Sequence, residues 1–104
     1  MDLIKKAQDG DREAFETVVE SNLMLVYHTI HKYFPGTKHL DDFFQAGCIG
    51  LIKAIRYFDF SYGVRFATYA VPMILGEIQR FWREFLATGP LRVGRRIKEG
   101  VLLK

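Results

Sequence analysis

The residues with the clearest chemical potential lie in one stretch, from Arg65 to Phe85, with the sequence RFATYAVPMILGEIQRFWREF. At the α-helical period this stretch divides into two faces. One face is apolar and predicts packing on other helices; it holds Ala67, Val71, Ile74, Ile78, Phe81 and Phe85. The opposite face, called the mixed face below, combines aromatic and soft apolar groups with a glycine and three arginines: Arg65, Tyr69, Pro72, Met73, Gly76, Arg80 and Arg83.

The mixed face suits a polyanion whose flat bases are contacted as well as its phosphates. That is the requirement for binding single-stranded or opening nucleic acid. The alternative is that the aromatic residues pack in a core while the arginines are solvated, and the pattern alone leaves both interpretations open. Pro72 lies inside the predicted helix, where a proline lowers helix stability by about 3 kcal/mol or more. Its presence indicates that a particular local backbone shape is required there.

The charge of the chain is distributed unevenly. The 104 residues, enough for one domain, carry a formal net charge of +3. Residues 1–64 hold 7 Lys/Arg and 9 Asp/Glu, a net charge of −2, whereas residues 65–104 hold 8 and 3, a net charge of +5. The basic potential therefore belongs to the half that carries the mixed face, which favours a nucleic-acid partner.

Other classes of function find little support in the sequence. Cys48 is the only cysteine, so we expect no disulfide and a cytoplasmic protein. No apolar run approaches the roughly 20 residues of a membrane span, and no third ligand accompanies His28 and His31, so neither membrane nor metal is expected. We find no nucleophile with a base, no phosphate loop and no paired carboxylates, which predicts a protein that is not an enzyme and needs no cofactor.

The elements that position the mixed face are predicted to be helices. Residues 2–8 form a short helix, Asp11 caps a second one, and the pattern pauses near Asn22 before a third helix that ends at Pro35 and Gly36. No run alternates with period two for long enough to predict a strand. We therefore expect an all-α, compact multi-helix domain.

A further helix is predicted from Asp41, with the sequence DDFFQAGCIGLIKAIRYF. Its core side holds Phe43, Phe44, Gly47, Leu51, Ala54, Ile55 and Phe58, and its outer side holds Asp42, Gln45, Ala46, Ile49, Ile52, Lys53 and Arg56. Two isoleucines on an outer side predict either a protein-docking face or a wider core, and the pattern favours neither. The turn DFSYG, with Asp59 as a cap and Gly63 at positive φ, brings this helix beside the one carrying the mixed face.

These two helices carry a family resemblance. The motif DDFFQAGCIGLIKAIRYFD followed by VRFATYAVPMILGEIQRF is similar to the second conserved domain of bacterial RNA polymerase sigma factors, which binds core polymerase and opens the promoter. AVPMILGEIQRF resembles the sporulation and general-stress branch, above all forespore sigma factors. The likeness covers residues 2–100 and implies a sigma domain 2 over residues 1–88. It implies a linker and the start of the third region over 89–104.

The resemblance also implies roles for individual residues. The positions that contact the coiled coil of the polymerase β′ subunit are Asp42, Gln45, Ala46, Cys48 and Ile52. The positions around the flipped base of the minus-ten element are Phe58, Phe66, Tyr69, Pro72 and Met73, with Gly76 and Gln79 at its upstream edge. Arg80 and Arg83 match the phosphate-facing side, and Arg96 and Glu99 match the extended minus-ten segment. Val64 departs from the primary sigma factors, which have an aromatic residue there.

The function expected from the sequence is that of a sigma-factor core domain that binds polymerase and the non-template strand of the minus-ten element. The alternative is a truncated decoy or regulatory form that occupies polymerase or an anti-sigma factor without initiating transcription. A helical module that binds duplex major groove is disfavoured, because the basic face lacks a helix-turn-helix partner. The family's fourth domain is absent from the sequence, so the chain is expected to be a fragment or a truncated protein.

Overall fold

The ends of the helices follow local chemistry, as the second helix shows. The computed structural model describes residues 2–88, and Asp11 has extended backbone there while its carboxylate accepts a hydrogen bond from the Ala14 amide at 3.0 Å. This is the expected N-cap. The pause predicted at Asn22 is also confirmed, because one helix ends at Ser21 and the next begins at Leu23.

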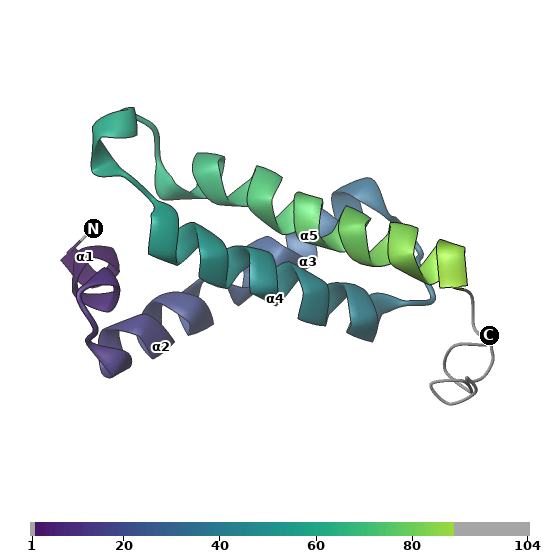
Figure 1. Cartoon of the computed structure of the whole chain (residues 1–104), viewed down its shortest axis with the longest axis horizontal. Helices are drawn as coiled ribbons and strands as arrows, with labels where there is room; N and C mark the ends of the chain where they lie inside the picture. Colours follow the sequence, from purple (N-terminus) through teal and green to yellow (C-terminus); the bar gives the residue numbers. More distant parts are fainter. Residues whose placement is uncertain (1, 89–104) are drawn as a thin grey trace.

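The described residues form only helices, turns and loops, with no strand between residues 2 and 88 (Figure 1). The predicted all-α class is therefore confirmed. Arg96 and Glu99, and with them the segment 89–104, lie outside the described residues. The elements in order are α1 (Asp2–Gln8), α2 (Arg12–Ser21), α3 (Leu23–Tyr33), α4 (Leu40–Tyr57), the 3-10 turn η1 (Phe60–Tyr62) and α5 (Phe66–Thr88).

Helices α4 and α5 form a long antiparallel hairpin, with α3 on its far side and α1 and α2 near its closed end (Figure 1). The hairpin is tight because α4 meets α5 through glycine. A Cβ atom at Gly50 would lie 2.6 Å from Ile74 Cα and 2.8 Å from the Met73 carbonyl carbon. Gly47 is similarly enclosed, since a Cβ there would lie 2.6 Å from Val26 Cγ1. The absence of side chains at these two glycines is therefore what allows α4 to approach its neighbours so closely.

The turn that closes the hairpin is built as its sequence predicts. The Asp59 carboxylate accepts hydrogen bonds from the Ser61 hydroxyl at 2.7 Å and the Ser61 amide at 2.8 Å. These two bonds, the hydroxyl first, lower the pKa of Asp59. Gly63 has φ +72°, which a side chain would disfavour, and it leads the chain from η1 into α5.

The core lies between the hairpin and α3, and it corrects the predicted face of α5. Ile74 and Ile78 are fully buried as expected, but the stripe continues through Ala70 and Phe66, while Ala67 and Val71 are only half-buried. The reason is that α4 lies along one side of α5, so the buried face near the closed end turns toward α4. None of the helices within residues 2–88 is long and apolar enough to span a membrane.

Candidate functional site

A cluster of aromatic rings fills the closed end of the hairpin. The Phe58 ring is at its centre, buried where α4 gives way to the turn. Its centroid lies 5.0 Å from Phe60, 6.3 Å from Tyr62, 5.5 Å from Phe66 and 5.4 Å from Tyr69. Edge-on and tilted arrangements of this kind are favourable for aromatic pairs. The cluster therefore holds the turn and the start of α5 together.

Two residues expected beside a captured base are inside this cluster. Phe58 and Phe66 are both buried, so they back the exposed rings and present no open face of their own. Tyr69 is partly enclosed: its ring contacts Phe58 and Tyr62, and its hydroxyl donates to the Tyr57 carbonyl at 3.4 Å. Desolvation, and then the neighbouring Tyr62 phenol, raise the pKa of Tyr69.

Much of the mixed face is open to solvent along α5. Pro72, Gly76 and Arg83 of this face are exposed, as is the neighbouring Gln79, whereas Met73 is half-buried and packs against the core. A Cβ atom at Gly76 would meet no atom of residues 2–88 within 4 Å, so packing among these residues does not require a glycine there. Within the described residues no ion-pair partner is found for Arg83 or for Arg65, which leaves both guanidinium groups open to a polyanion.

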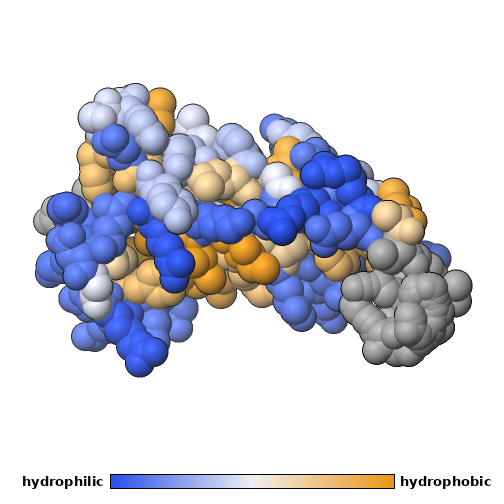
Figure 2. Space-filling model, in the orientation of Figure 1, coloured by the Kyte–Doolittle hydropathy of each residue, from blue (hydrophilic) through white to orange (hydrophobic). Residues whose placement is uncertain are grey.

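Arg80 has different surroundings from the other arginines of the mixed face. Its guanidinium lies 3.6 Å from Glu77 and 3.5 Å from Glu84, and Glu77 also pairs with Lys53 of α4 at 2.7 Å. A row of alternating charges therefore crosses from α4 to α5. Figure 2 shows a hydrophilic band along the boundary of these two helices, next to a hydrophobic area. Arg80 belongs to this row, at the edge of the mixed face nearest α4.

The row borders a groove between α4 and α5 of about 400 Å³, lined by Asp42, Gln45, Ala46, Ile49, Lys53, Glu77, Arg80, Phe81 and Glu84. The groove brings together Ile49 of the predicted docking face and three residues expected to contact polymerase, namely Asp42, Gln45 and Ala46. Ile49 remains 49% exposed, which confirms its outward position. Ala46 was expected on the outer side, but it is only 8% exposed, because it lies at the bottom of the groove facing α5.

The other two residues of that set do not line the groove. Cys48 and Ile52 lie on α4 and are half-buried. Cys48 packs against the core, and burial raises the pKa of its thiol. Ile52 is half-buried, so part of its side chain belongs to a wider core, while its place in a docking face stays a prediction.

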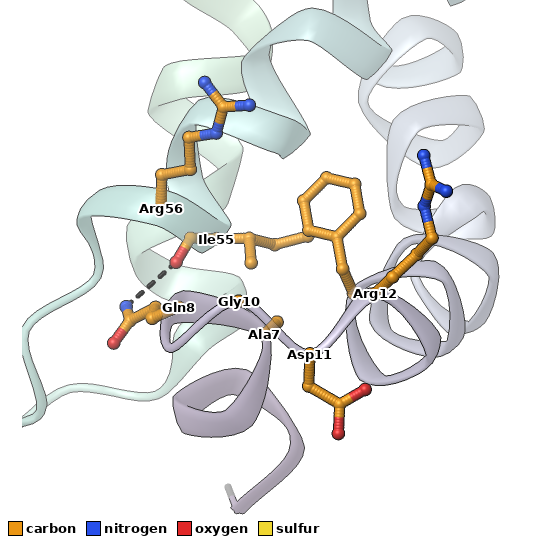
Figure 3. A pocket seen from close by; sticks show the side chains of 8 residues that line it. Ala7, Gln8, Gly10, Asp11, Arg12, Ile55 and Arg56 are labelled. Carbon is orange, nitrogen blue, oxygen red and sulfur yellow. Dashed lines mark hydrogen bonds between the residues drawn. The ribbon is translucent and has the colours of Figure 1, made fainter.

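A second hollow, of about 450 Å³, lies between the α1–α2 turn and the end of α4 (Figure 3). At its edge the Gln8 amide donates to the Ile55 carbonyl at 2.9 Å and to the Phe58 carbonyl at 2.8 Å. These are carbonyls that the end of a helix leaves without partners. Sequence reasoning missed this contact, because no periodic signal connects residues about 50 positions apart.

The geometry defines a class: a helical domain whose central hairpin carries a mixed-charge groove along its length and an aromatic cluster at its closed end. Comparison with known proteins then gives the family. Residues 18–84 match the family model of sigma-70 region 2, and the chain therefore belongs to the sigma-70 family.

Individual relatives agree with this assignment. The chain is 49% identical over 98 residues to the RNA polymerase sigma-F factor of Priestia megaterium, a match that covers 94% of this chain and 38% of the relative. It is 46% identical over 98 residues to the RNA polymerase sigma-G factor of Bacillus subtilis (strain 168), covering 93% of this chain and 36% of the relative. The chain thus spans less than two fifths of the length of either relative. The likeness to the sporulation branch predicted from AVPMILGEIQRF is confirmed.

Proposed function

We propose that this chain acts as the part of a sigma factor that binds core RNA polymerase and recognises and opens the minus-ten element of promoters. The observation that carries the proposal is the match of residues 18–84 to sigma-70 region 2. The fold is compatible with binding polymerase and DNA at the same time, since the groove and the aromatic cluster are separate surfaces of one hairpin.

The groove between α4 and α5 is the proposed docking surface for the β′ coiled coil of polymerase. Ile49 provides an exposed apolar anchor, and Asp42, Gln45 and Lys53 surround it with polar groups. An apolar centre with a polar rim is the usual anatomy of a specific protein interface. Ala46 and Phe81 would form its floor, while Cys48 and Ile52 would support it from the neighbouring face of α4.

The mixed face and the aromatic cluster are the proposed surface for the non-template strand. Opening duplex DNA means unstacking and unpairing a base, which costs a few kcal/mol. Stacking on an aromatic side chain offsets about 1–3 kcal/mol per base. Exposed arginines such as Arg65 and Arg83 would hold the phosphates, while Gly76 and Gln79 would contact base edges. No chemical step is needed for this function.

The docking claim is tested by placing a charge in the groove. Ile49→Glu should weaken binding of the full chain to core polymerase roughly 30-fold or more, because an anchor at an interface centre is worth about 2 kcal/mol. Ile52→Glu should weaken binding less and also lower thermal stability, since that side chain is half-buried. Met24→Glu is the matched control, an exposed apolar residue on α3 away from the groove, and should leave binding unchanged.

Affinity is measured by titration with core polymerase, and folding by circular dichroism. Unchanged affinity of a folded Ile49→Glu variant would show that the groove is not the docking surface. Promoter opening is followed in the same complexes by permanganate reactivity of unpaired thymines. Tight binding of the wild-type chain without any opening would favour the decoy or regulatory form over an initiating one.

A further inference from the structure

The second hollow, between the α1–α2 turn and the end of α4, belongs to neither of the proposed surfaces. Its volume is about 450 Å³. Among residues 2–88 it shares no lining residue with the groove between α4 and α5, and none of its lining residues is a member of the aromatic cluster. It is therefore a separate candidate for a binding site.

Hydrogen bonds fix the walls of this hollow. The Gln8 amide donates to the Ile55 and Phe58 carbonyls and so joins the α1–α2 turn to the end of α4. The turn is closed by Gly10 at φ +103° and by the Asp11 amide, which donates back to a carbonyl of α1 at 3.0 Å. This is the Schellman arrangement that commonly ends a helix. Because the walls are already in place, little conformational freedom is lost when a ligand binds.

The floor of the hollow is apolar and its rim is open. Ile55 is fully buried, and Phe15 and Ala7 are half-buried and pack against the core. Arg12 and Arg56 are exposed at the rim. Sites for small molecules bury most of the ligand's surface, which a hollow with an open rim does not do. It is better suited to one apolar side chain of a larger partner that lies across it.

Two guanidinium groups give the rim a positive charge. Figure 3 shows the Arg12 and Arg56 side chains extending from α2 and α4 to the same side of the hollow, while the Asp11 carboxylate points the other way. Neither arginine has an ion-pair partner among residues 2–88, and the Asp11 carboxylate accepts a hydrogen bond from the Ala14 amide. Both guanidinium groups are therefore available for charge-assisted hydrogen bonds to carboxylates.

The surroundings of the hollow favour a protein segment over a nucleic acid. Residues 2–21, which form α1, α2 and the turn between them, hold six acidic and three basic residues. A nucleic-acid strand requires a positively charged groove that follows its backbone, and this surface would repel the strand on either side of the two arginines. A protein segment needs only a few carboxylates at the rim.

We propose that the second hollow is a docking site for an acidic segment of a partner protein. The segment places one apolar side chain on Phe15 and Ile55, and its carboxylates bind Arg12 and Arg56. The proposal goes beyond the proposed function, because this site requires neither polymerase nor DNA. Since the hollow and the groove have different lining residues, a partner in the hollow leaves the groove free.

The probe is a phage-displayed library of random dodecapeptides, selected on the full chain. The library first passes over the double variant Arg12→Glu, Arg56→Glu, which removes peptides that bind elsewhere on the surface. Both arginines are exposed and form no ion pair within residues 2–88, so the double variant should keep the helical spectrum and melting temperature of the wild type. The enriched peptides should carry Asp or Glu on both sides of a large apolar residue.

One enriched peptide is then synthesised and titrated. Arg12→Glu and Arg56→Glu should each lower its affinity about tenfold or more, because a carboxylate then faces a like charge. Replacing the apolar residue of the peptide by alanine should cost at least as much, since that side chain is the anchor. Lys38→Glu is the matched control, the same change of charge at an exposed lysine before the start of α4, and should leave the affinity unchanged.

A double substitution connects an arginine to its carboxylate. Arg56→Ala and an Asp→Asn or Glu→Gln change in the peptide should each weaken binding. If the two groups contact each other, combining the changes should cost less than the sum of the separate losses. Additive losses for every carboxylate of the peptide, with Arg56 and with Arg12, would contradict the proposed contacts.

The remaining outcomes are equally decisive. If no peptide is enriched over the double variant, or the enriched peptides lack acidic residues, the hollow is not a docking site of this kind. If random single-stranded DNA loses affinity with Arg12→Glu but not with Lys38→Glu, while no peptide is enriched, the rim binds phosphates instead. If Arg12→Glu weakens binding to core polymerase as strongly as binding to the peptide, the hollow is part of the polymerase interface and a separate site is ruled out. Ile49→Glu should leave peptide binding intact, so failure of the groove and failure of the hollow are distinguished.

Discussion

Two glycines on facing helices make opposite predictions for the same substitution. At Gly50 an added Cβ would lie 2.6 Å from Ile74 Cα and 2.8 Å from the Met73 carbonyl carbon, both of them main-chain atoms of α5. Ordinary carbon contacts are about 3.5–4.0 Å, so the two helices must separate by roughly 1 Å. Overpacking of this kind costs typically 1–3 kcal/mol, occasionally more. Gly50→Ala should therefore destabilise the domain despite the better helix propensity of alanine.

At Gly76 the added Cβ would meet no atom within 4 Å in the part of the chain that the structure describes. The substitution then leaves only the propensity term, since glycine in a helix interior is about 0.8–1.0 kcal/mol less favourable than alanine. Gly76→Ala should stabilise the domain by about that amount. If the open space above Gly76 receives a DNA strand, the same variant should bind single-stranded promoter DNA more weakly while being more stable.

Thermal unfolding followed by circular dichroism measures both variants. A change of 1 kcal/mol shifts the melting temperature by roughly 4–8 °C for a domain of this size. Gly76→Ala should melt higher than the wild type by about that shift, and Gly50→Ala should melt lower. A Gly50→Ala variant at least as stable as the wild type would refute the close approach of α4 and α5. A destabilised Gly76→Ala variant would show that something in the chain occupies the space above it.

Two further predictions concern single contacts. Arg83→Ala should lower the slope of log affinity against log salt by about 0.7 for single-stranded DNA, whereas Arg80→Ala should lower it less, because Glu77 and Glu84 already engage Arg80. Titrations at several salt concentrations measure both slopes, and equal slopes would contradict the difference. Gln8→Ala should lower the free energy of unfolding by about 1–3 kcal/mol, since two carbonyls at the end of α4 lose their donor. A thermal melt unchanged from the wild type would show that water replaces the amide without cost.

Much of the fold could be predicted because its signals are local. The Asp11 cap, the break at Asn22 and the positive φ of Gly63 each depend on a few neighbouring residues, and the structure has all three. The outward position of Ile49 likewise followed from helical period alone. Such features need no knowledge of which helix packs against which.

The predictions that failed depend on the direction of a neighbouring helix. Ala46 and Phe66 are buried because α4 and α5 face each other across them, and one helix's pattern cannot say on which side its partner lies. The hydrogen bonds of Gln8 have the same origin, since their acceptors lie about 50 positions away at the end of another helix. The ion pairs of Arg80 are local, with Glu77 and Glu84 three and four positions away on α5, so helical spacing alone could have predicted them. The exposure of Tyr62 and its ring contact with Tyr69 were not predicted either, because a turn has no period from which exposure can be inferred.

The length of α4 sets the distance between the groove and the closed end of the hairpin. Its residues pass from the groove at Ile49 to the closed end of the hairpin at Tyr57, and a helix rises about 1.5 Å per residue, so the two surfaces are roughly 12 Å apart along the axis. Over this interval α4 packs closely against α5 at Gly50 and is joined to it by the Lys53–Glu77 ion pair. The distance between the two surfaces is therefore fixed, whereas a loop of the same length could extend. The helix is thus a spacer: under the proposed function, the number of residues between Ile49 and Tyr57 would determine how far a DNA strand at the closed end is held from a protein seated in the groove.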